Sequence, residues 1–160
     1  MTGKEIIENW IIRCHADRSG NRVFPNIYIG KFEADILELT KSGYLYEYEV
    51  KISRSDFKND VKKGNKYKLL KHGERVTYFS YIVPEGLISP NEVDDDFGLI
   101  YVRLGDVHYH SQEGDYTAIK MFHTVIKKPK KLRQAKATDK EINKLYEKIY
   151  WRFHKGREKK

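Results

Sequence analysis

Residues 32–52 read FEADILELTKSGYLYEYEVKI, two apolar and aromatic runs with regularly placed charges around one polar turn. Residues 32–39 and 44–52 have the composition of strands, and Lys41-Ser42-Gly43 between them has the composition of a turn. The pattern predicts two strands joined as a hairpin. We therefore expect a β-sheet that is built outward from this hairpin.

The second of these strands places three charged side chains on one face. Successive side chains of a strand point to opposite faces, so Glu47, Glu49 and Lys51 share one face. The other face is shared by Tyr46, Tyr48, Val50 and Ile52. We expect a hairpin register that brings Asp35 of the first strand across from Glu49. Two carboxylates and one lysine would then converge on the same side of the hairpin.

The rest of the chain predicts helices and strands on both sides of this hairpin. Apolar residues at helical spacing predict a helix over residues 4–17, and Thr138-Asp139-Lys140-Glu141 has the capping-box pattern of a helix start. The other expected elements are a strand at 24–29, a helix at 53–72, strands at 76–83 and 99–104, a turn at Gly105-Asp106, a hairpin of 107–109 with 116–125, and a helix at 138–154. The order α-β-β-β-α-β, followed by a hairpin and a helix, predicts one α/β domain around a mixed sheet.

Composition restricts the class of protein. The 160 residues are 39% hydrophobic and 34% charged, and no stretch approaches the roughly 20 apolar residues of a membrane span. Cys14 is the single cysteine, which excludes an internal disulfide and a cysteine-based zinc site and indicates a reducing, cytoplasmic location. We therefore expect a soluble globular domain without a membrane span; the further expectation of no membrane partner depends on the residues that carry chemistry.

The net charge of +8 is concentrated in two regions. Residues 127–160 hold 14 Lys and Arg against 4 Asp and Glu, a local charge of +10, and residues 51–75 hold 9 against 3. Concentrated positive charge favours a polyanionic partner. Charge alone leaves nucleic acid and an anionic membrane surface both open, so the choice depends on residues that carry chemistry.

Asp35, Glu49 and Lys51 form the first candidate site. Two converging carboxylates suit a hard cation such as Mg²⁺ or Mn²⁺, which prefers oxygen ligands and retains several waters. Such a cation can activate water and stabilise charge on a phosphodiester, and the lysine can hold the attacking water or an oxyanion. The alternative is a cross-strand salt bridge between exposed charges, which is common on half-solvated sheets.

Longer motifs around these residues resemble a known family. In chain order they are Ala34-Asp35-Ile36, Glu49-Val50-Lys51-x-Ser53, Asp56-Phe57-x-x-Asp60-x-Lys62, Tyr78-Phe79 with Val83-Pro84, and Phe97-Gly98-Leu99-Ile100-Tyr101-Val102. They span about 70 of the 160 residues and resemble the PD-(D/E)xK nuclease superfamily, within it the MmcB-like DNA-repair and phage-encoded nuclease-like proteins. The resemblance implies a restriction-endonuclease-like α-β-β-β-α-β core, dependence on Mg²⁺ or Mn²⁺, and a DNA substrate.

The resemblance also implies roles for individual residues. Asp35 and Glu49 would bind the metal together with the Val50 carbonyl, and Lys51 would position water or stabilise the developing charge. A further acid is expected upstream. Because Pro25-Asn26 stands where the strand would supply a glutamate, the first helix must provide that acid.

Glu8 and Glu5 are the candidates for this upstream acid, and Glu8 lies nearer the edge of the apolar helix face. Asp56 and Asp60 resemble positions of the family that support the catalytic residues or contact phosphate, and Asp56 would orient Lys51 or order the start of the 53–72 helix. The alternative is a helix-start carboxylate at Asp56 and, favoured for Asp60 taken alone, an ordinary helix residue. The residues expected to contact the DNA backbone are Ser53, Arg54, Lys58, Lys62, Lys66, Lys127, Lys128, Lys130 and Lys131.

Three segments are expected: a nuclease-like domain over residues 1–126, a basic connector over 127–137 and a basic C-terminal helix over 138–160. The predicted function is a Mg²⁺-dependent deoxyribonuclease, bacterial or phage-encoded, that acts in DNA repair, recombination or phage DNA processing. One alternative is a catalytically inactive nucleic-acid-binding module on the same fold. Another is an assembly subunit whose basic tail docks on an acidic partner. The sequence leaves a homodimer open.

One further motif combines aromatic and basic residues near the C-terminus. Tyr150-Trp151-x-Phe153 lies among Lys148, Arg152 and Lys155. The rings could stack on nucleic-acid bases while the cations hold phosphates. The favoured interpretation is instead that they pack the last helix onto the domain.

Overall fold

The chain forms a six-stranded sheet in which the spatial order of the strands follows their order in the sequence. The structure is a computed structural model and describes residues 1–16, 20–62 and 64–155. Within these ranges the strands are β1 (Arg22–Ile29), β2 (Phe32–Leu39), β3 (Leu45–Val50), β4 (Tyr78–Pro84), β5 (Gly98–Tyr109) and β6 (Tyr116–Lys127). The helices are α1 (Gly3–Ala16), α2 (Arg54–Val61), α3 (Gly64–Lys71) and α4 (Asp139–Lys155), with a short 3-10 turn at Pro90–Glu92.

The sheet is mixed. β1, β2 and β3 form an antiparallel meander, β3, β4 and β5 run parallel, and β6 returns antiparallel to β5. Antiparallel neighbours can be joined by short turns, whereas the parallel step from β3 to β4 needs a crossover, which α2 and α3 provide. The α/β class with a mixed sheet is therefore confirmed, and two helices rather than one separate the third and fourth strands.

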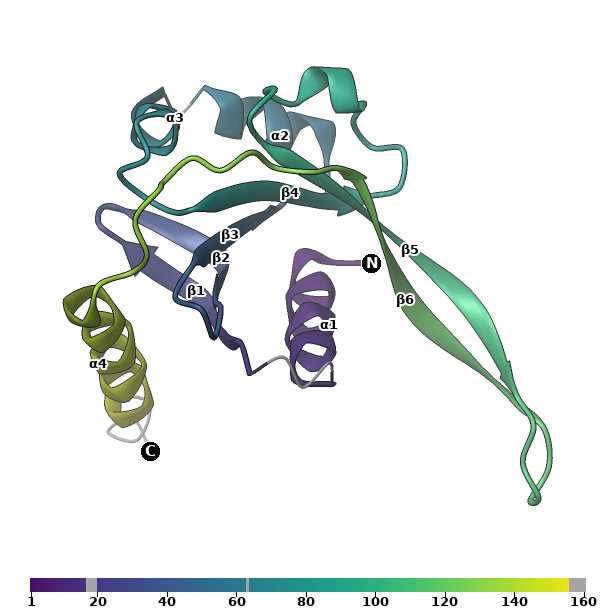
Figure 1. Cartoon of the computed structure of the whole chain (residues 1–160). Coiled ribbons are helices and arrows are strands. Elements are labelled where there is room, and N and C mark those ends of the chain that lie inside the picture. The colour runs from purple at the N-terminus through teal and green to yellow at the C-terminus, as the bar shows by residue number, and fades with distance from the viewer. Residues whose placement is uncertain (17–19, 63, 156–160) are drawn as a thin grey trace.

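Two apolar layers hold helices against the two faces of the sheet (Figure 1). On one face, α1 buries Ile6, Trp10 and Cys14, so Cys14 is a core residue as expected. On the other face, Phe57 of α2 and Leu70 of α3 pack into a larger layer that also contains Leu145 of α4. The alternation predicted for β3 serves both layers, because each face of this central strand is covered.

The prediction of one continuous helix over residues 53–72 is wrong, because the segment forms two helices. α2 ends at Val61 and α3 begins at Gly64, a residue with low helix propensity. Asp60 and Lys66 are both buried, yet around one continuous helix they would point about 120° apart. The interruption between the helices lets both side chains face the sheet.

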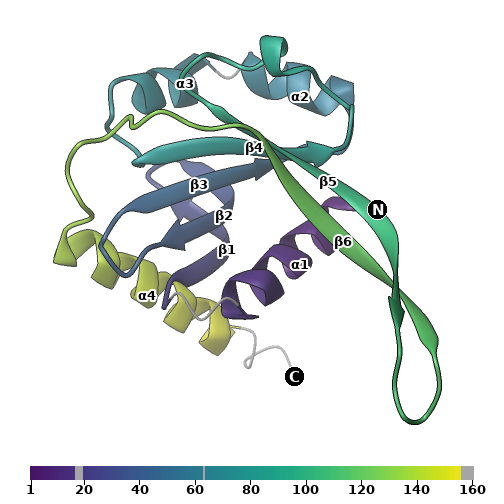
Figure 2. The same cartoon turned by 45° about the vertical axis from the view of Figure 1, so that its right-hand side comes forward.

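The turn predicted at Gly105-Asp106 is also wrong, because β5 runs through both residues without a break. A Cβ atom at Gly105 would lie 3.0 Å from the Arg103 side chain and 3.0 Å from the Phe122 ring. Glycine therefore allows a close approach of side chains within the strand rather than a reversal of direction. β5 and β6 consequently form one long hairpin that extends beyond the rest of the sheet (Figures 1 and 2).

The basic connector is fixed to the sheet by main-chain hydrogen bonds. The amides of Lys130, Leu132 and Ala137 donate to the carbonyls of Asp96, Thr77 and Gly43 at 2.9, 2.9 and 2.8 Å. These three carbonyls precede β5, β4 and β3, respectively. The connector therefore lies along the N-terminal ends of the three parallel strands.

α4 begins at its predicted capping box. The Glu141 amide donates to Thr138 Oγ1 at 3.2 Å, and the Thr138 amide donates to Glu141 Oε2 at 2.8 Å. Leu145 is buried, and Ile142 and Ile149 pack beside it, so the helix is docked on the larger apolar layer. No helix in the described ranges combines the length and apolarity needed to cross a membrane.

His123 on β6 should make stability depend on pH. Burial against Trp10, together with the nearby Arg13, lowers the pKa of His123 to about 4. Between pH 6.5 and 4 the unfolded chain therefore binds a proton that the folded chain does not, so stability falls as the pH drops through this range. We expect a loss of about 1 kcal/mol from pH 7 to pH 5, discounted for partial exposure.

Urea unfolding of His123→Gln at both pH values measures this contribution. The variant should lose less stability between pH 7 and pH 5 than the wild type. His108→Gln, at an exposed position on β5, is the matched control and should retain the wild-type pH dependence. An identical pH dependence in all three proteins would contradict the prediction.

Candidate active site

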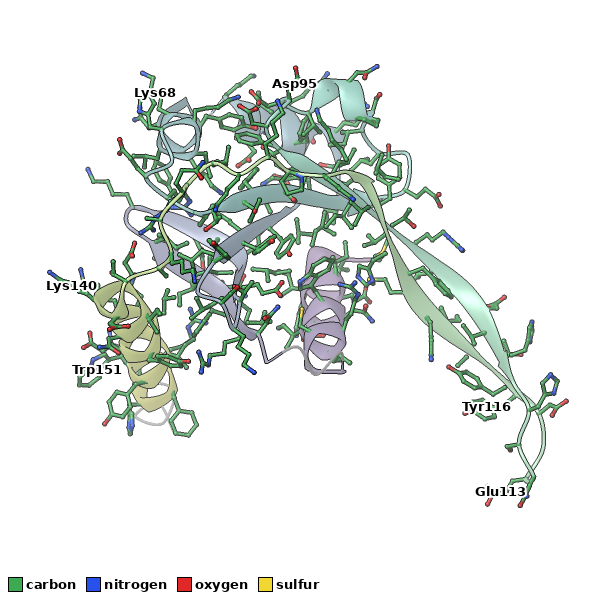
Figure 3. The ribbon with its side chains drawn as sticks, viewed as in Figure 1. Lys68, Asp95, Glu113, Tyr116, Lys140 and Trp151 are labelled. Atoms are coloured by element: carbon green, nitrogen blue, oxygen red, sulfur yellow. The ribbon has the colours of Figure 1, made fainter. Side chains whose placement is uncertain are left out.

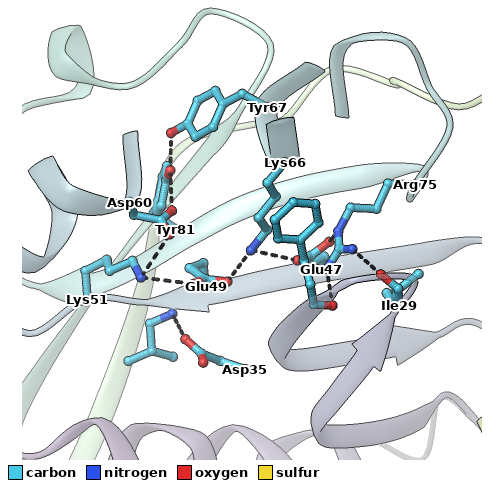
Figure 4. Close-up of polar contacts among 12 residues, drawn as sticks. Ile29, Asp35, Glu47, Glu49, Lys51, Asp60, Lys66, Tyr67, Arg75 and Tyr81 are labelled. Carbon is cyan, nitrogen blue, oxygen red and sulfur yellow. Dashed lines mark hydrogen bonds and ion pairs between the residues drawn. The ribbon is translucent and has the colours of Figure 1, made fainter. Parts of the chain in front are cut away.

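The β2–β3 hairpin places Asp35 beside Glu49. Its antiparallel register pairs Ile36 with Tyr48, so the next residues on the two strands are Asp35 and Glu49, as expected from the sequence. Asp35 Oδ2 accepts a hydrogen bond of 2.7 Å from the Val50 amide, where the strands begin to separate (Figure 4). The carboxylate therefore lies at the end of the hairpin rather than inside the ladder.

Two lysines hold the carboxylate of Glu49. Lys51 Nζ lies 2.9 Å from Glu49 Oε1, and Lys66 Nζ lies 2.7 Å from Glu49 Oε2. Lys51 follows β3 directly, whereas Lys66 reaches the sheet from α3. Both oxygens of Glu49 are thus occupied by cations at distances typical of charge-assisted hydrogen bonds.

The same network continues along β3 to Arg75. Lys66 Nζ also lies 3.1 Å from Glu47 Oε1, and Arg75 binds Glu47 in a bidentate manner through Nε at 2.5 Å and Nη2 at 2.8 Å. Glu47 is fully buried. Buried carboxylates require paired, hydrogen-bonded partners, and these two cations supply them.

At its other end the network passes from Lys51 to α2 and β4. Lys51 Nζ lies 3.5 Å from Asp60 Oδ1, and the Tyr81 hydroxyl donates to Asp60 Oδ2 at 3.1 Å. Tyr67 and Tyr81 also share a hydrogen bond between their hydroxyls. Among the groups drawn in Figure 4, the buried carboxylates of Glu47, Glu49 and Asp60 are matched by the buried cations of Lys51, Lys66 and Arg75.

Asp35 adds negative charge to this balanced network. Burial, with a further contribution from the charge of Glu49, raises the pKa of Asp35 to about 6, although the Val50 amide partly opposes the shift. Burial alone would lower the pKa of Lys51, but Glu49 and Asp60 together raise it above its usual value. Lys51 is therefore a permanent cation near neutral pH and is suited to stabilise an anion rather than to remove a proton.

Two cavities meet at Asp35. The larger, of about 670 Å³, lies between α1 and the edge of the hairpin, and the smaller, of about 310 Å³, lies over the charged network. Asp35, Val50 and Asp56 line both cavities. Together the cavities form one open cleft, and Asp35 is one of the three residues common to its apolar and charged parts.

The cleft distinguishes the two candidates for the upstream acid. Glu8 lines the larger cavity with Asp35, whereas Glu5 accepts a hydrogen bond of 2.6 Å from the Thr2 amide at the start of α1. Burial of Glu5 is negligible, and the hydrogen bonds from Thr2 lower its pKa. The structure therefore brings Glu8, and not Glu5, to the Asp35 cavity.

The atoms that could bind a metal ion at this site are oxygens. Asp35, Glu49 and the Val50 carbonyl lie at the end of the hairpin, but the described part of the chain contains no group of three or more Asp, Glu, His or Cys side chains placed to bind a metal ion. A hard cation bound at Asp35 would thus depend on main-chain oxygen and on water for much of its coordination. Such a donor set suits Mg²⁺, which retains several waters.

Two residues expected to contact DNA have structural roles instead. The Lys66 side chain is only 3% exposed because it reaches under α3 to Glu47 and Glu49. It lines the smaller cavity, but its charge is paired with these two carboxylates rather than presented on the outer surface. Lys127 Nζ donates to the carbonyls of Val93 at 2.8 Å and Asp94 at 3.1 Å. For both residues, the expectation of a surface phosphate contact is corrected.

The other positively charged candidates divide between the two ends of the sheet. Arg54 pairs with Glu92 next to the cleft, and Lys58 and Lys62 are exposed on and just after α2. Lys130 pairs with Asp96 at 3.0 Å on the connector, and Lys128 and Lys131 are exposed there. The connector lies at the N-terminal end of β3 and the cleft at its C-terminal end, so the expected basic surface is not continuous.

The acidic and hydroxyl candidates near the lysine lie close to it. Ser53 caps α2 by accepting a hydrogen bond of 3.2 Å from the Asp56 amide, as its sequence position predicts. Asp56 Oδ1 lies 4.0 Å from Lys51 Nζ and is half-exposed, whereas Asp60 is buried. The sequence suggested Asp56 as a partner of Lys51, and the structure places Asp56 and also Asp60 beside it.

Sequence reasoning missed two features of the site. The alternation of β3 placed Glu47 on the same face as Glu49, a signal that a second acid is buried there, but nothing in the pattern linked it to Arg75. The register also places Asn26 opposite Asp35 on β1, where its φ of 48° lies in the left-handed region. Asparagine adopts this conformation more readily than most residues.

Comparisons with known proteins add information on the fold. A comparison with protein-family models finds no match, and a comparison with curated protein sequences finds none either. Among solved structures, this chain is similar to SPO1766, a protein of unknown function from Silicibacter pomeroyi, with a TM-score of 0.54 and 18% sequence identity. The similarity covers 94% of this chain and 82% of that one. At this level of identity the two chains share a fold, and the likeness indicates nothing about activity.

Proposed function

We propose that this protein is a metal-dependent nuclease that hydrolyses DNA phosphodiester bonds on a restriction-endonuclease-like core. The observation that carries the proposal is the convergence of Asp35, Glu49 and Lys51 at the meeting point of two cavities. The motifs around these residues, the mixed sheet and the position of Lys51 directly after β3 agree with this activity. The excess of basic residues in the chain supports a polyanionic substrate.

Each residue has a defined task in this proposal. Asp35, Glu49 and the Val50 carbonyl would hold Mg²⁺ or Mn²⁺, which when bound lowers the pKa of a coordinated water and offsets charge on the scissile phosphate. Lys51 stays protonated and donates hydrogen bonds to a phosphate oxygen as negative charge develops. Asp60, itself held by Tyr81, positions Lys51.

A second candidate function is a nucleic-acid-binding module without catalytic activity. It is favoured by the pairing of both Glu49 oxygens with lysines, since each ion pair uses one lone pair of its oxygen and places a positive charge beside the position of a metal ion. In this case the network would serve the stability of the fold, and the cleft would bind a phosphate backbone without cutting it.

Nicking of supercoiled plasmid separates these functions. The nuclease should convert supercoiled to open-circular DNA in Mg²⁺ or Mn²⁺, and EDTA should stop the reaction. DNA binding in EDTA that weakens with salt, without any nicking in either metal, would support the binding module and reject the nuclease. The absence of both nicking and binding would reject both functions.

The two basic regions should contribute unequally to DNA binding. Replacing Lys58 and Lys62 together by Gln should reduce the slope of log K against log salt by about 0.9 for each lost contact, because α2 begins next to the cleft. Replacing Lys128 and Lys131 by Gln removes the same charge at the distant connector and should leave the slope unchanged. Filter binding over a range of salt concentrations measures both slopes, and a larger reduction in the connector variant would contradict this assignment.

A further inference from the structure

The last turns of α4 expose aromatic rings that the fold does not use. Tyr150 is 56% exposed and Trp151 is 60% exposed, although the sequence favoured their packing onto the domain. Their ring centroids lie 5.3 Å apart, and the Tyr150 ring lies 4.3 Å from that of His154. Figure 3 shows Trp151 on α4. We call Tyr150, Trp151 and His154 the aromatic patch.

The aromatic patch lies on a helix segment with excess positive charge. Residues 144–155 contain four Lys and Arg and one Glu. Lys148 Nζ donates to the Tyr28 carbonyl at 2.5 Å, and Arg152 Nη1 donates to the Pro25 carbonyl at 2.8 Å. Because these acceptors carry no formal charge, the contacts orient the two side chains without neutralising them.

Arg152 connects the aromatic patch to the cleft. Its two terminal nitrogens hold the carbonyls of Pro25 and Asn26 on β1. Both of these residues line the larger cavity together with Asp35, and Asn26 lies opposite Asp35 in the register. The aromatic patch therefore begins on the helix turn that holds one wall of the cleft.

Exposed rings among cations are the arrangement that binds unpaired nucleic-acid strands. Each base offers a flat face to an aromatic side chain only when it is not stacked within a duplex, while cations hold the phosphates between bases. A duplex would meet the same cations but would leave the rings without a partner. A protein partner fits less well, because the four cations around these rings would require a strongly acidic surface.

We propose that the aromatic patch binds an unpaired strand of the DNA substrate and leads it past Pro25 and Asn26 to the cleft. This inference rests on the proposed function insofar as it takes DNA as the substrate. It adds the substrate class: DNA with a single-stranded region next to the bond that is cut. Affinity for that region should depend on the rings of Tyr150 and Trp151.

Tryptophan fluorescence provides a test that does not need cleavage. The chain has two tryptophans, of which Trp10 is 4% exposed and Trp151 is 60% exposed, so a ligand at the surface should quench Trp151 alone. In EDTA, the full-length protein is titrated with single-stranded oligothymidylate and with a blunt duplex of equal length. Quenching should be strong with the single strand and weak with the duplex.

Tyr150→Ala tests the ring directly. Loss of one stacking ring should weaken oligothymidylate binding about tenfold and leave duplex binding unchanged. Tyr116→Ala is the matched control, since Tyr116 is a similarly exposed tyrosine (57%) near the tip of the β5–β6 hairpin, far from α4 (Figure 3). This control should bind both DNAs as the wild type does.

Three results would overturn the inference. The first is an unchanged affinity of Tyr150→Ala for the single strand, and the second is equal quenching by single strand and duplex. The third is a change in Trp151 fluorescence with protein concentration alone, which would assign the aromatic patch to self-association. Plasmid nicking is measured separately. Quenching without nicking rejects the nuclease but not the binding of a single strand, whereas nicking without quenching rejects strand binding at the aromatic patch but not the nuclease.

Discussion

Asp35→Asn is expected to lower metal-dependent DNA cleavage by at least about 100-fold while DNA binding in EDTA stays at the wild-type level. Asparagine has the same shape and can still accept the hydrogen bond from the Val50 amide, but it removes the charge that would hold a divalent cation. The measurement is the initial rate of plasmid nicking in Mg²⁺ and in Mn²⁺, with a parallel binding assay.

Asp106→Asn is the matched control for this variant. It makes the same chemical change at an exposed position on β5, outside both cavities that Asp35 lines, and should cleave at the wild-type rate. Cleavage by Asp35→Asn at the wild-type rate would remove Asp35 from the catalytic site. It would leave the charged network as a purely structural feature.

The same substitution should stabilise the protein in EDTA. The pKa of Asp35 rises from 3.8 to about 6 on folding, so the folded chain binds more protons between these pH values and becomes less stable as the pH rises through them. Above pH 6 the full penalty of the buried charge is present, and Asp35→Asn removes it. The full shift corresponds to about 3 kcal/mol. Because Asp35 is only partly buried, we expect a smaller gain of about 1 kcal/mol in the free energy of unfolding at neutral pH, measured with urea.

Lys51 and Glu49 are less suitable for this test than Asp35. From the sequence alone, neutralising any of the three should remove cleavage and leave the fold intact. In the structure, Lys51 and Glu49 are buried partners, so removing either leaves an uncompensated charge inside the protein. Lost cleavage in these two variants would therefore combine a catalytic effect with lost stability.

The hairpin of β2 and β3 could be predicted because its information is local. Alternation along residues 44–52 assigns faces, the turn fixes the register, and the register aligns Asp35 with Glu49. The bounds of β2 were also predicted correctly, since Phe32 and Leu39 begin and end a segment without glycine or proline. The acid–lysine arrangement at the end of the hairpin follows directly from these local rules.

The roles of the lysines could not be predicted in this way. Nothing in the sequence distinguishes Lys66 and Lys127 from the other lysines of the basic segments. Their partners lie far along the chain: Lys66 pairs with Glu47, and Lys127 donates to carbonyls that follow the 3-10 turn. The connector likewise looks like a free linker. Its position at the far end of the sheet depends on hydrogen bonds to Thr77 and Gly43.

Arg75→Ala is expected to destabilise the protein by about 3–5 kcal/mol, the range for removing one partner of a buried ion pair. Arg75 is 3% exposed and binds both oxygens of Glu47, which is fully buried. It also donates to the carbonyls of Ile29 at 2.7 Å and Phe32 at 3.2 Å, on either side of the turn between β1 and β2. One substitution therefore leaves a buried carboxylate and two carbonyls short of a donor.

Urea unfolding should show this loss as a large shift of the midpoint. Lys68→Ala removes a cation from the exposed side of α3 and should change stability by less than about 0.5 kcal/mol. If Arg75→Ala lowers the free energy of unfolding by less than about 1 kcal/mol, water must take over the hydrogen bonds of the guanidinium. The network would then be more open to solvent than its burial indicates.

A double-mutant cycle with Glu47→Gln separates the pair from the rest of the network. If Arg75 acts mainly through Glu47, the two single variants should each lose several kcal/mol and the double variant little more, because an amide facing an alanine leaves no buried charge unmatched. Lys66 retains Glu49 in every corner of the cycle. Additive losses would instead show that Arg75 stabilises the fold chiefly through the β1–β2 turn, and the charge balance of the site would not depend on it.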